Sequence, residues 1–245
     1  MSKRMNGPDN RIGWCDFTAN PVRGKCQYQC PNCYAEQIRL RFGWSEKMTF
    51  VTDWYNWNQV KQFVHERKRN PIIFVGSMYD IFGDWVPWEW IQEIFDQCKG
   101  EPAWFMFLTQ NPKRYREFSI PGNCIVGTTV RRQTEVKRIK ILIDCVPFYT
   151  RKFISFEPLF EKLTLKFINM SLLYWLIFGA ETGKEKKYCP PEAIMSLITK
   201  YPDTPIYVKQ IHLLTKTGFE VSKNPDEWPL IYQKREFPKC MNRLL

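Results

Sequence analysis

Short apolar runs alternate with amphipathic segments along most of the chain. The apolar runs are about five residues long and are bounded by turn-forming residues, as buried strands are. Strands are therefore predicted at residues 72–76, 104–109, 124–130, 152–156, 173–178 and 205–209, with an opening strand at 12–18.

The segments between these runs have apolar residues at helical spacing. Ile91, Ile94 and Phe95 fall on one helical face, as do Val136 and Ile139 further along the chain. Pro112 is suited to the first turn of a short helix. Longer helices are predicted at 57–67, 87–95, 136–143 and 191–200.

This alternation predicts an α/β fold in which helical crossovers join parallel strands. With six or seven strand–helix units, we expect a partial or full parallel (β/α) barrel of about six strands. No linker or internal repeat divides the chain, so a single domain over 1–245 is expected, with a core at about 12–212 and a C-terminal extension at 213–245. In such barrels the working groups lie at the C-terminal ends of the strands.

Composition and charge narrow the class of protein. The chain is 44% hydrophobic, has no apolar run long enough to span a membrane, and begins with a polar segment. We therefore expect a cytoplasmic protein without membrane contact. The formal charge of +11 favours an anionic partner such as nucleic acid, although a basic surface also serves solubility. Basic clusters occur at 67–69, 113–116, 131–140 and 184–187.

Cysteine spacing supplies the most specific chemistry. Cys26, Cys30 and Cys33 have the spacing C-x3-C-x2-C, and thiols in a reducing cytosol serve metal ligation rather than cross-linking. Three thiolates can hold an iron–sulfur cluster that has one iron open to a small molecule. The alternative is a zinc site, which needs a fourth ligand, and Cys15 is the nearest thiol for it.

At this triplet the chain resembles the radical S-adenosylmethionine (SAM) superfamily, whose signature is a C-x3-C-x2-C loop after the first strand of a partial α/β barrel. The superfamily often has an aromatic residue directly before the third cysteine, where this chain has Asn32 and places Tyr34 after it. Further segments resemble a phage- and prophage-associated branch, to which spore photoproduct lyase is a more distant relative. These segments are Trp14–Gly24, Cys33–Glu36, Phe74–Asp80, Leu108–Arg114, Val126–Val130, Ser155–Leu159, Phe178–Gly183 and Val208–Gln210.

The resemblance implies a barrel of the radical-SAM type, with a 4Fe–4S cluster held by the triplet and SAM on the open iron. It also implies an external electron donor, similar to flavodoxin or ferredoxin, and hydrogen abstraction from a substrate by a 5′-deoxyadenosyl radical. Nucleic acid or a nucleotide is the expected substrate. The rival hypothesis is a non-catalytic nucleic-acid-binding protein that zinc or a fully ligated cluster stabilises, with Cys15 as the fourth ligand.

Polar residues at the predicted strand ends are candidates for cofactor binding. Ser77 and Asp80 follow the strand at 72–76, where the superfamily binds the amino group of SAM; a turn or N-cap aspartate is the alternative for Asp80. Threonines at these ends are also common strand formers, and the charged residues could equally form surface salt bridges. The remaining candidates are Thr109, Thr129, Glu157, Glu181 and Lys209.

Overall fold

The computed structural model describes residues 5–7, 12–166, 168–182 and 186–241. The chain forms two compact units, the first ending at Val126 and the second beginning at Gly127. Strand β6 (Cys124–Thr129) begins in the first unit and ends in the second. Gly183 and Lys184, which belong to sequence features noted above, lie outside the described residues.

The first unit contains three parallel strands in the order β1 (Phe17–Ala19), β4 (Ile72–Val75) and β5 (Trp104–Thr109). All residues of β1 and β4 are buried, and β4 is apolar on both faces, as strands of covered parallel sheets are. The structure confirms the predicted positions of β4 and β5. The opening strand predicted at 12–18 is wrong in its start, because residues 12–16 form mostly turns and bends and the strand begins at Phe17.

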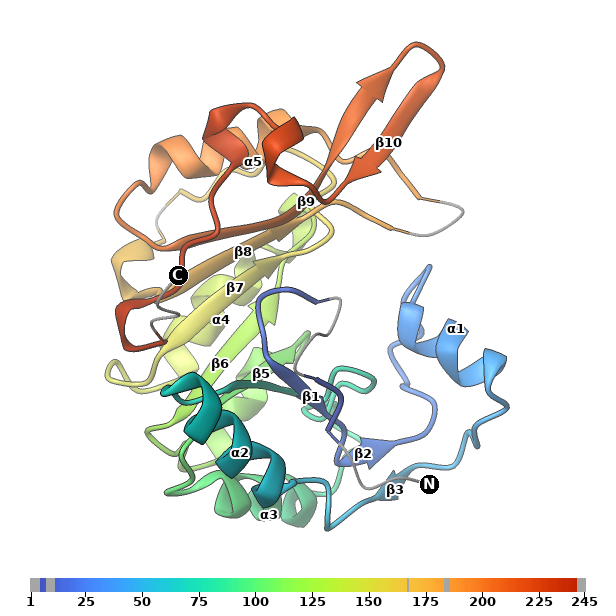
Figure 1. Ribbon diagram of the computed structural model, residues 1–245, viewed down its shortest axis with the longest axis vertical. Coiled ribbons are helices and arrows are strands. Elements are labelled where there is room, and N and C mark those ends of the chain that lie inside the picture. The colour runs from blue at the N-terminus through green and yellow to red at the C-terminus, as the bar shows by residue number, and fades with distance from the viewer. Residues whose placement is uncertain (1–4, 8–11, 167, 183–185, 242–245) are drawn as a thin grey trace. The chain divides into compact units, whose positions relative to one another are not determined.

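Helices α2 (Trp57–Arg67) and α3 (Trp88–Cys98) pack on this sheet (Figure 1). Phe63 of α2 lies edge-on to Phe17 of β1, with ring centroids 5.4 Å apart. Both helices occupy segments that are predicted to be helical, and the spacing of Ile91, Ile94 and Phe95 predicts the second.

The first unit also contains elements that the hydrophobic pattern does not predict. Two short antiparallel strands, β2 (Val22–Arg23) and β3 (Thr49–Phe50), flank helix α1 (Tyr34–Arg41) in the chain. Only Ala35 and Arg39 of α1 are buried, so the helix has no apolar stripe that its sequence could reveal. The strands are two residues long each, too short for a periodic pattern.

The second unit contains parallel strands β7 (Lys152–Phe156), β8 (Trp175–Gly179) and β9 (Ile206–Thr215). Every residue of β7 and β8 is buried. Strand β9 continues beyond the predicted strand and pairs with the antiparallel strand β10 (Gly218–Ser222), which forms the extended hairpin seen in Figure 1.

Helices α4 (Lys137–Cys145) and α5 (Pro191–Lys200) belong to the second unit and match the predicted helices. Short 3-10 helices occur at Pro112–Glu117, Gln133–Glu135, Met170–Leu172, Pro225–Glu227, Leu230–Tyr232 and Lys239–Met241. The eight strands β1 and β4–β10 are mostly parallel and alternate with helices, so the predicted α/β fold class is confirmed. Among the described residues, we find no helix with the length and hydropathy needed to cross a bilayer.

Candidate cluster and cofactor site

The three cysteines of the triplet lie on the loop between β2 and α1, and all three side chains are partly exposed. Two residues within the loop, Gln29 and Asn32, have positive φ angles of 45° and 55°. These left-handed residues reverse the chain between successive cysteines, and the backbone N–H of Cys33 donates to the carbonyl of Cys30. The loop therefore turns back on itself with its thiols spaced along it.

Cys26, Cys30 and Cys33 line one cavity of about 950 Å³ in the first unit. The end of β1, the cysteine loop, α1 and β3 contribute its walls. A cavity of this size is at the upper end of the range of small-molecule sites, roughly 300–1,000 Å³. The space is sufficient for a cofactor together with part of a substrate.

A cluster and a single metal ion make different demands on the donor set. In an iron–sulfur cluster each thiolate binds a different iron, so the thiols surround a volume instead of converging on a point. Within the part of the chain that the structure describes, no three His, Cys, Asp or Glu side chains are placed to hold one ion. Cys15 is 3% exposed and is not one of the residues that line the cavity.

A hydrogen-bond network ties the cysteine loop to the end of β5. The side-chain amide of Gln110 donates to Sγ of Cys30 over 2.9 Å, and its backbone N–H donates to Oδ2 of Asp80 over 2.8 Å. Thr109 Oγ1 donates to the other carboxylate oxygen of Asp80, also over 2.8 Å. Asp80 and Thr109, both candidates from the sequence, are thus in contact, and Asp80 is oriented by groups of the chain itself.

The pKa of the Cys26 thiol is raised, chiefly by burial. Backbone N–H groups of Asp80 and Tyr28 oppose this shift by donating to the sulfur, while the charges of Asp80 and Cys30 add to it. Cys26 therefore lies beside the network around Asp80. Thiolate ligation at this position would release a proton on metal binding.

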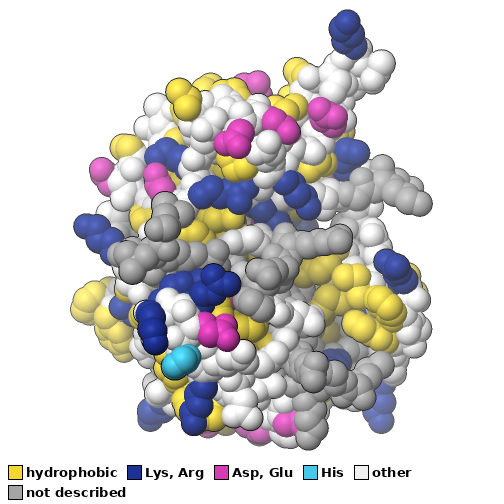
Figure 2. Space-filling model, viewed as in Figure 1, with side chains coloured by type: hydrophobic (Ala, Val, Ile, Leu, Met, Phe, Trp, Pro, Cys, Tyr) yellow, Lys and Arg dark blue, Asp and Glu magenta, His cyan; other side chains and the backbone are white. Residues whose placement is uncertain are grey.

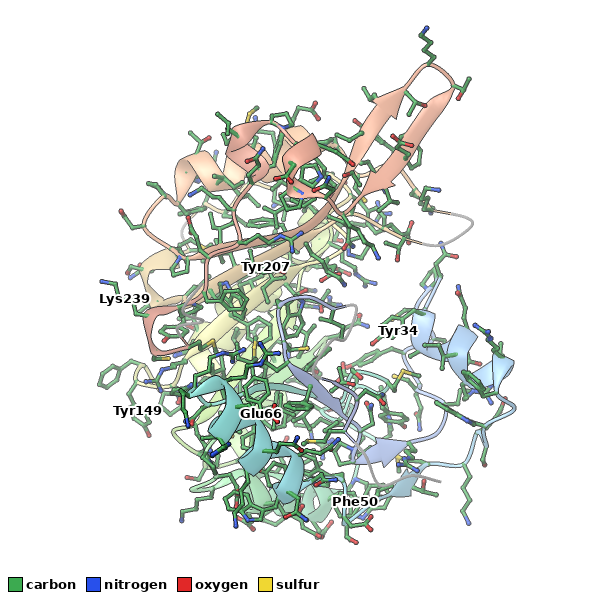
Figure 3. All side chains as sticks on the ribbon, in the orientation of Figure 1. Tyr34, Phe50, Glu66, Tyr149, Tyr207 and Lys239 are labelled. Atoms are coloured by element: carbon green, nitrogen blue, oxygen red, sulfur yellow. The ribbon has the colours of Figure 1, made fainter. Side chains whose placement is uncertain are left out.

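Ser77 lies in the turn that follows β4, where it is bonded to Asn20. Its hydroxyl donates to Oδ1 of Asn20 over 3.2 Å, and the backbone N–H of Met78 donates to the same oxygen. The hydroxyl of Tyr34, labelled in Figure 3 on α1, donates to the carbonyl of Ser77. The first residue after the triplet is therefore connected to the turn that carries Ser77.

Gln110, Asn20 and Tyr34 are the site residues that sequence reasoning missed. Each belongs to a segment that carries the family resemblance, but amides and a tyrosine have no distinctive spacing of their own. Their positions next to the triplet or next to Ser77 become apparent only in the fold.

In the second unit, Glu157 and Lys209 form an ion pair with side chains 19% and 21% exposed. Gly179 allows this arrangement, because a Cβ on it would lie 2.9 Å from Cγ of Glu157 and 3.1 Å from Nε2 of Gln210. The buried Oε1 of Gln210 has no hydrogen-bond partner within the described structure. Two of the predicted strand-end charges are thus brought together in one polar group.

Glu181 and Thr129 lie in other surroundings. The backbone N–H of Glu181 donates to Sγ of Cys189, and its carbonyl is 2.8 Å from Nε2 of His212. The carbonyl of Thr129 accepts from Arg138 over 3.1 Å. These contacts hold the backbone of their own unit in place, and a cofactor role for either side chain stays a prediction.

Comparison with known families decides the classification. The model of the family described as "Protein of unknown function (DUF5131)" matches residues 9–225, which is most of the chain. The chain belongs to this family. No curated protein matches its sequence. Membership of a phage-associated branch stays a prediction.

Solved structures of spore photoproduct lyase share the fold. The lyase complexed with dinucleoside spore photoproduct has a TM-score of 0.50 at 10% identity, over 92% of this chain and 72% of that chain. A double mutant with bound AdoMet and the same dinucleoside has a TM-score of 0.50 at 11% identity, with the same coverage. At this identity the likeness concerns the fold, and it agrees with the radical-SAM type of barrel expected from the sequence.

Proposed function

We propose that this member of the family is a radical SAM enzyme whose Cys26, Cys30 and Cys33 ligate a 4Fe–4S cluster. The observation that carries the proposal is the placement of all three thiols around one cavity, in a fold shared with spore photoproduct lyase. A cluster held there and reduced by an external donor would supply one electron to bound SAM, and so a carbon radical made from SAM.

The chain's own residues position these groups. Gln110 orients the thiolate of Cys30 through its side-chain N–H. Asp80, held by Thr109 and by the backbone of Gln110, offers a fixed carboxylate that suits the ammonium group of SAM. Ser77, fixed by Asn20, belongs to the same turn. Preorientation of this kind excludes unproductive poses and is the protein's usual share of cofactor chemistry.

The remaining strand-end candidates, Thr129, Glu157, Glu181 and Lys209, are proposed as contacts to cofactor or substrate. We propose nucleic acid or a nucleotide as substrate, supported by the net charge of +11. The structural neighbours that contain a dinucleoside photoproduct are consistent with this choice. A flavodoxin- or ferredoxin-like protein is the proposed electron donor.

Anaerobic reconstitution tests the proposal. The protein is expected to take up about four iron and four sulfide per chain and, with SAM and dithionite, to form 5′-deoxyadenosine. Cys30→Ala should abolish both results, whereas Cys15→Ala, the matched control outside the cavity, should retain the cluster. Tight zinc binding without cluster uptake would contradict the proposal, as would a reconstituted cluster that yields no 5′-deoxyadenosine.

A further inference from the structure

Helix α1 ends in a geometry that presents two aromatic rings. Gly43 has a φ of +62°, its N–H donates to the carbonyl of Leu40, and the N–H of Trp44 donates to the carbonyl of Arg39. These two bonds form a Schellman motif, a common helix ending with a left-handed glycine. The rings of Phe42 and Trp44 stack with centroids 5.5 Å apart and an interplanar angle of 19°. We call this stacked pair the aromatic ledge.

The aromatic ledge is exposed yet held in place. Phe42 is 59% exposed and Trp44 is 39% exposed, and Figure 2 shows hydrophobic side chains gathered over α1. Arg39 is buried and fixes the backbone, because its Nη1 donates to the carbonyl of Trp44 over 2.8 Å while its other nitrogens bind Glu36. Large aromatic rings held at the surface in this way mark interaction sites.

The aromatic ledge belongs to the wall of the cavity that the cysteine triplet lines. Phe42, Gly43 and Trp44 all contribute to it. Helix α1 has eight residues, so at 1.5 Å per residue the ledge lies about 12 Å along the helix from Cys33. A ligand on the ledge is therefore in the same cavity as the triplet but is not itself at the thiols.

Basic residues line the same cavity as the aromatic ledge, together with the acidic Glu36 and Asp53. Arg23 and Lys47 line the cavity, and neither forms an ion pair with a described carboxylate. Gly24 brings their segments together, since a Cβ on it would lie 2.8 Å from the carbonyl oxygen of Lys47. The guanidinium of Arg41 lies over the ring of Phe42, 5.5 Å from its centroid. Stacking rings interleaved with cations are the usual elements of single-strand nucleic-acid sites.

A buried hydrogen-bond donor completes the cavity wall. Trp54 lines the cavity and is 4% exposed, and its Nε1–H has no acceptor among the described residues. Indole N–H groups usually have a partner when buried, because leaving one unpaired costs free energy. The nitrogen is closed off from solvent in this conformation, so a ligand in the cavity would reach it only after a side-chain movement.

We propose that the aromatic ledge and the basic residues beside it form a nucleotide-binding subsite, in which bases stack on Phe42 and Trp44 and phosphates contact Arg23 and Lys47. The inference rests on the proposed function, since it places part of the substrate in the cavity of the triplet. The basic side chains favour a phosphate over the cationic sulfonium of SAM. Binding energy from a part of the substrate that does not react would serve to orient the part that does.

The subsite is tested by fluorescence anisotropy with a labelled twelve-residue oligothymidylate at low salt, with competition by thymidine monophosphate. The joint replacement Phe42→Ala with Trp44→Ala should weaken oligonucleotide binding about tenfold or more. The single replacement Trp44→Phe retains a stacking ring, so this variant should keep most of the affinity of the native protein. Trp57→Ala is the matched control, because Trp57 is also 39% exposed but lies on α2 outside the cavity. It should leave the dissociation constant unchanged.

An abasic oligomer of the same length separates stacking from charge, because it retains the phosphates and lacks the bases. It should bind at least tenfold more weakly than oligothymidylate. Equal affinity of the two oligomers would overturn the subsite and would favour a partner that recognises charge alone, such as an acidic protein. An equal loss in the ledge variant and in Trp57→Ala would also overturn it.

Arg23→Gln and Lys47→Gln should each reduce the slope of the logarithm of affinity against the logarithm of salt concentration, by about one phosphate contact. Competition by the monophosphate at comparable concentration identifies a free nucleotide as the ligand, whereas much tighter oligomer binding identifies a strand. Failure of the native protein to bind either one overturns the subsite.

These measurements require no SAM cleavage, so they separate the two proposals. Loss of 5′-deoxyadenosine formation with intact stacking-dependent binding contradicts only the proposed reaction. Normal 5′-deoxyadenosine formation by the native protein without nucleotide binding contradicts only the subsite. Thermal unfolding of each variant is the control for correct folding.

Discussion

The side-chain amide of Gln110 donates a hydrogen bond to Sγ of Cys30, with Nε2 and Sγ 2.9 Å apart. The bond joins the end of β5 to the cysteine loop across 80 residues of sequence. An N–H directed at a cluster-ligating sulfur stabilises the more negative, reduced state and so raises the reduction potential. Gln110 therefore has a predicted electronic effect as well as a structural one.

Replacing Gln110 by Leu should lower the reduction potential of the reconstituted cluster. Loss of a differential stabilisation of about 1 kcal/mol corresponds to a shift of about 40 mV for one electron. The measurement is a redox titration followed by electron paramagnetic resonance. Gln62→Leu is the control, since Gln62 is exposed on α2 and bonds to Glu66. Identical potentials in the two variants would show that Gln110 has no influence on the cluster.

The ion pair between Glu157 and Lys209 should contribute to stability more than an exposed pair does. Lys209→Met leaves the half-buried carboxylate of Glu157 unpaired, and we expect the free energy of unfolding to fall by about 2 kcal/mol. Combining it with Glu157→Gln should recover at least half of that loss. Urea unfolding measures both effects.

The control for this pair is Lys140→Met. Lys140 pairs with Asp144, and their side chains are 70% and 53% exposed. This change should alter the free energy of unfolding by less than about 1 kcal/mol. A similar loss in Lys209→Met and Lys140→Met would mean that the partial burial of Glu157 and Lys209 has no energetic consequence.

His212 should make the protein less stable in mild acid. Burial lowers the pKa of His212, nearby Lys186 lowers it further, and the carbonyl and side chain of Glu181 oppose the shift. The unfolded state, with a pKa of about 6.5, then binds more protons than the folded state below that pH. The contribution of His212 is therefore fully present above pH 6.5 and is lost as the pH falls, by at most about 1.4 kcal/mol per pH unit.

His212→Gln should flatten this dependence between pH 7 and pH 5, as measured by urea unfolding at several pH values. It should also lower stability at pH 7, because Nδ1 of His212 accepts from the N–H of Cys189 over 2.9 Å. His65→Gln provides the control, since His65 is exposed on α2. Unchanged slopes in His212→Gln would assign the acid sensitivity to other groups.

Three glycine-to-alanine changes should lower the free energy of unfolding by amounts that follow the backbone geometry at each glycine. Gly24 has a φ of +123° and close backbone neighbours, so Gly24→Ala should cost about 3 kcal/mol. Gly43→Ala should cost about 1 kcal/mol, because Gly43 is left-handed but has open space around it. Gly122→Ala, also in open space, should cost less than about 0.5 kcal/mol. Thermal or urea unfolding measures these losses, and any other order of the three variants would contradict the prediction.

The sequence predicts the strands best, because a strand buried on both faces is mostly apolar. Runs such as Ile72–Val75 are therefore visible without the structure. Helix α1 could not be predicted in the same way, since it buries little apolar surface. Strand β10 has alternating exposed and partly buried residues and is defined by its pairing with β9.

In the candidate site, too, local features can be predicted from the sequence and contacts between distant residues cannot. The spacing of the triplet is a local property and can be read from the chain, whereas the contact of Gln110 with Cys30 depends on the fold. The sequence also does not show which basic side chains are used within the fold. Arg69, in one of the basic clusters, binds Asp16 with both terminal nitrogens, and Arg114 donates to the carbonyls of Gly83 and Val86.

The length of helix α1 also determines the direction in which the rings of the aromatic ledge point. Because the helix turns by about 100° per residue, the face on which Phe42 and Trp44 emerge is fixed by the count of residues after Cys33. One inserted residue would rotate the rings by more than a quarter turn, whereas an insertion of about one full turn would restore their direction further along the axis. Members of the family that use the same surface should therefore vary the length of this helix by whole turns.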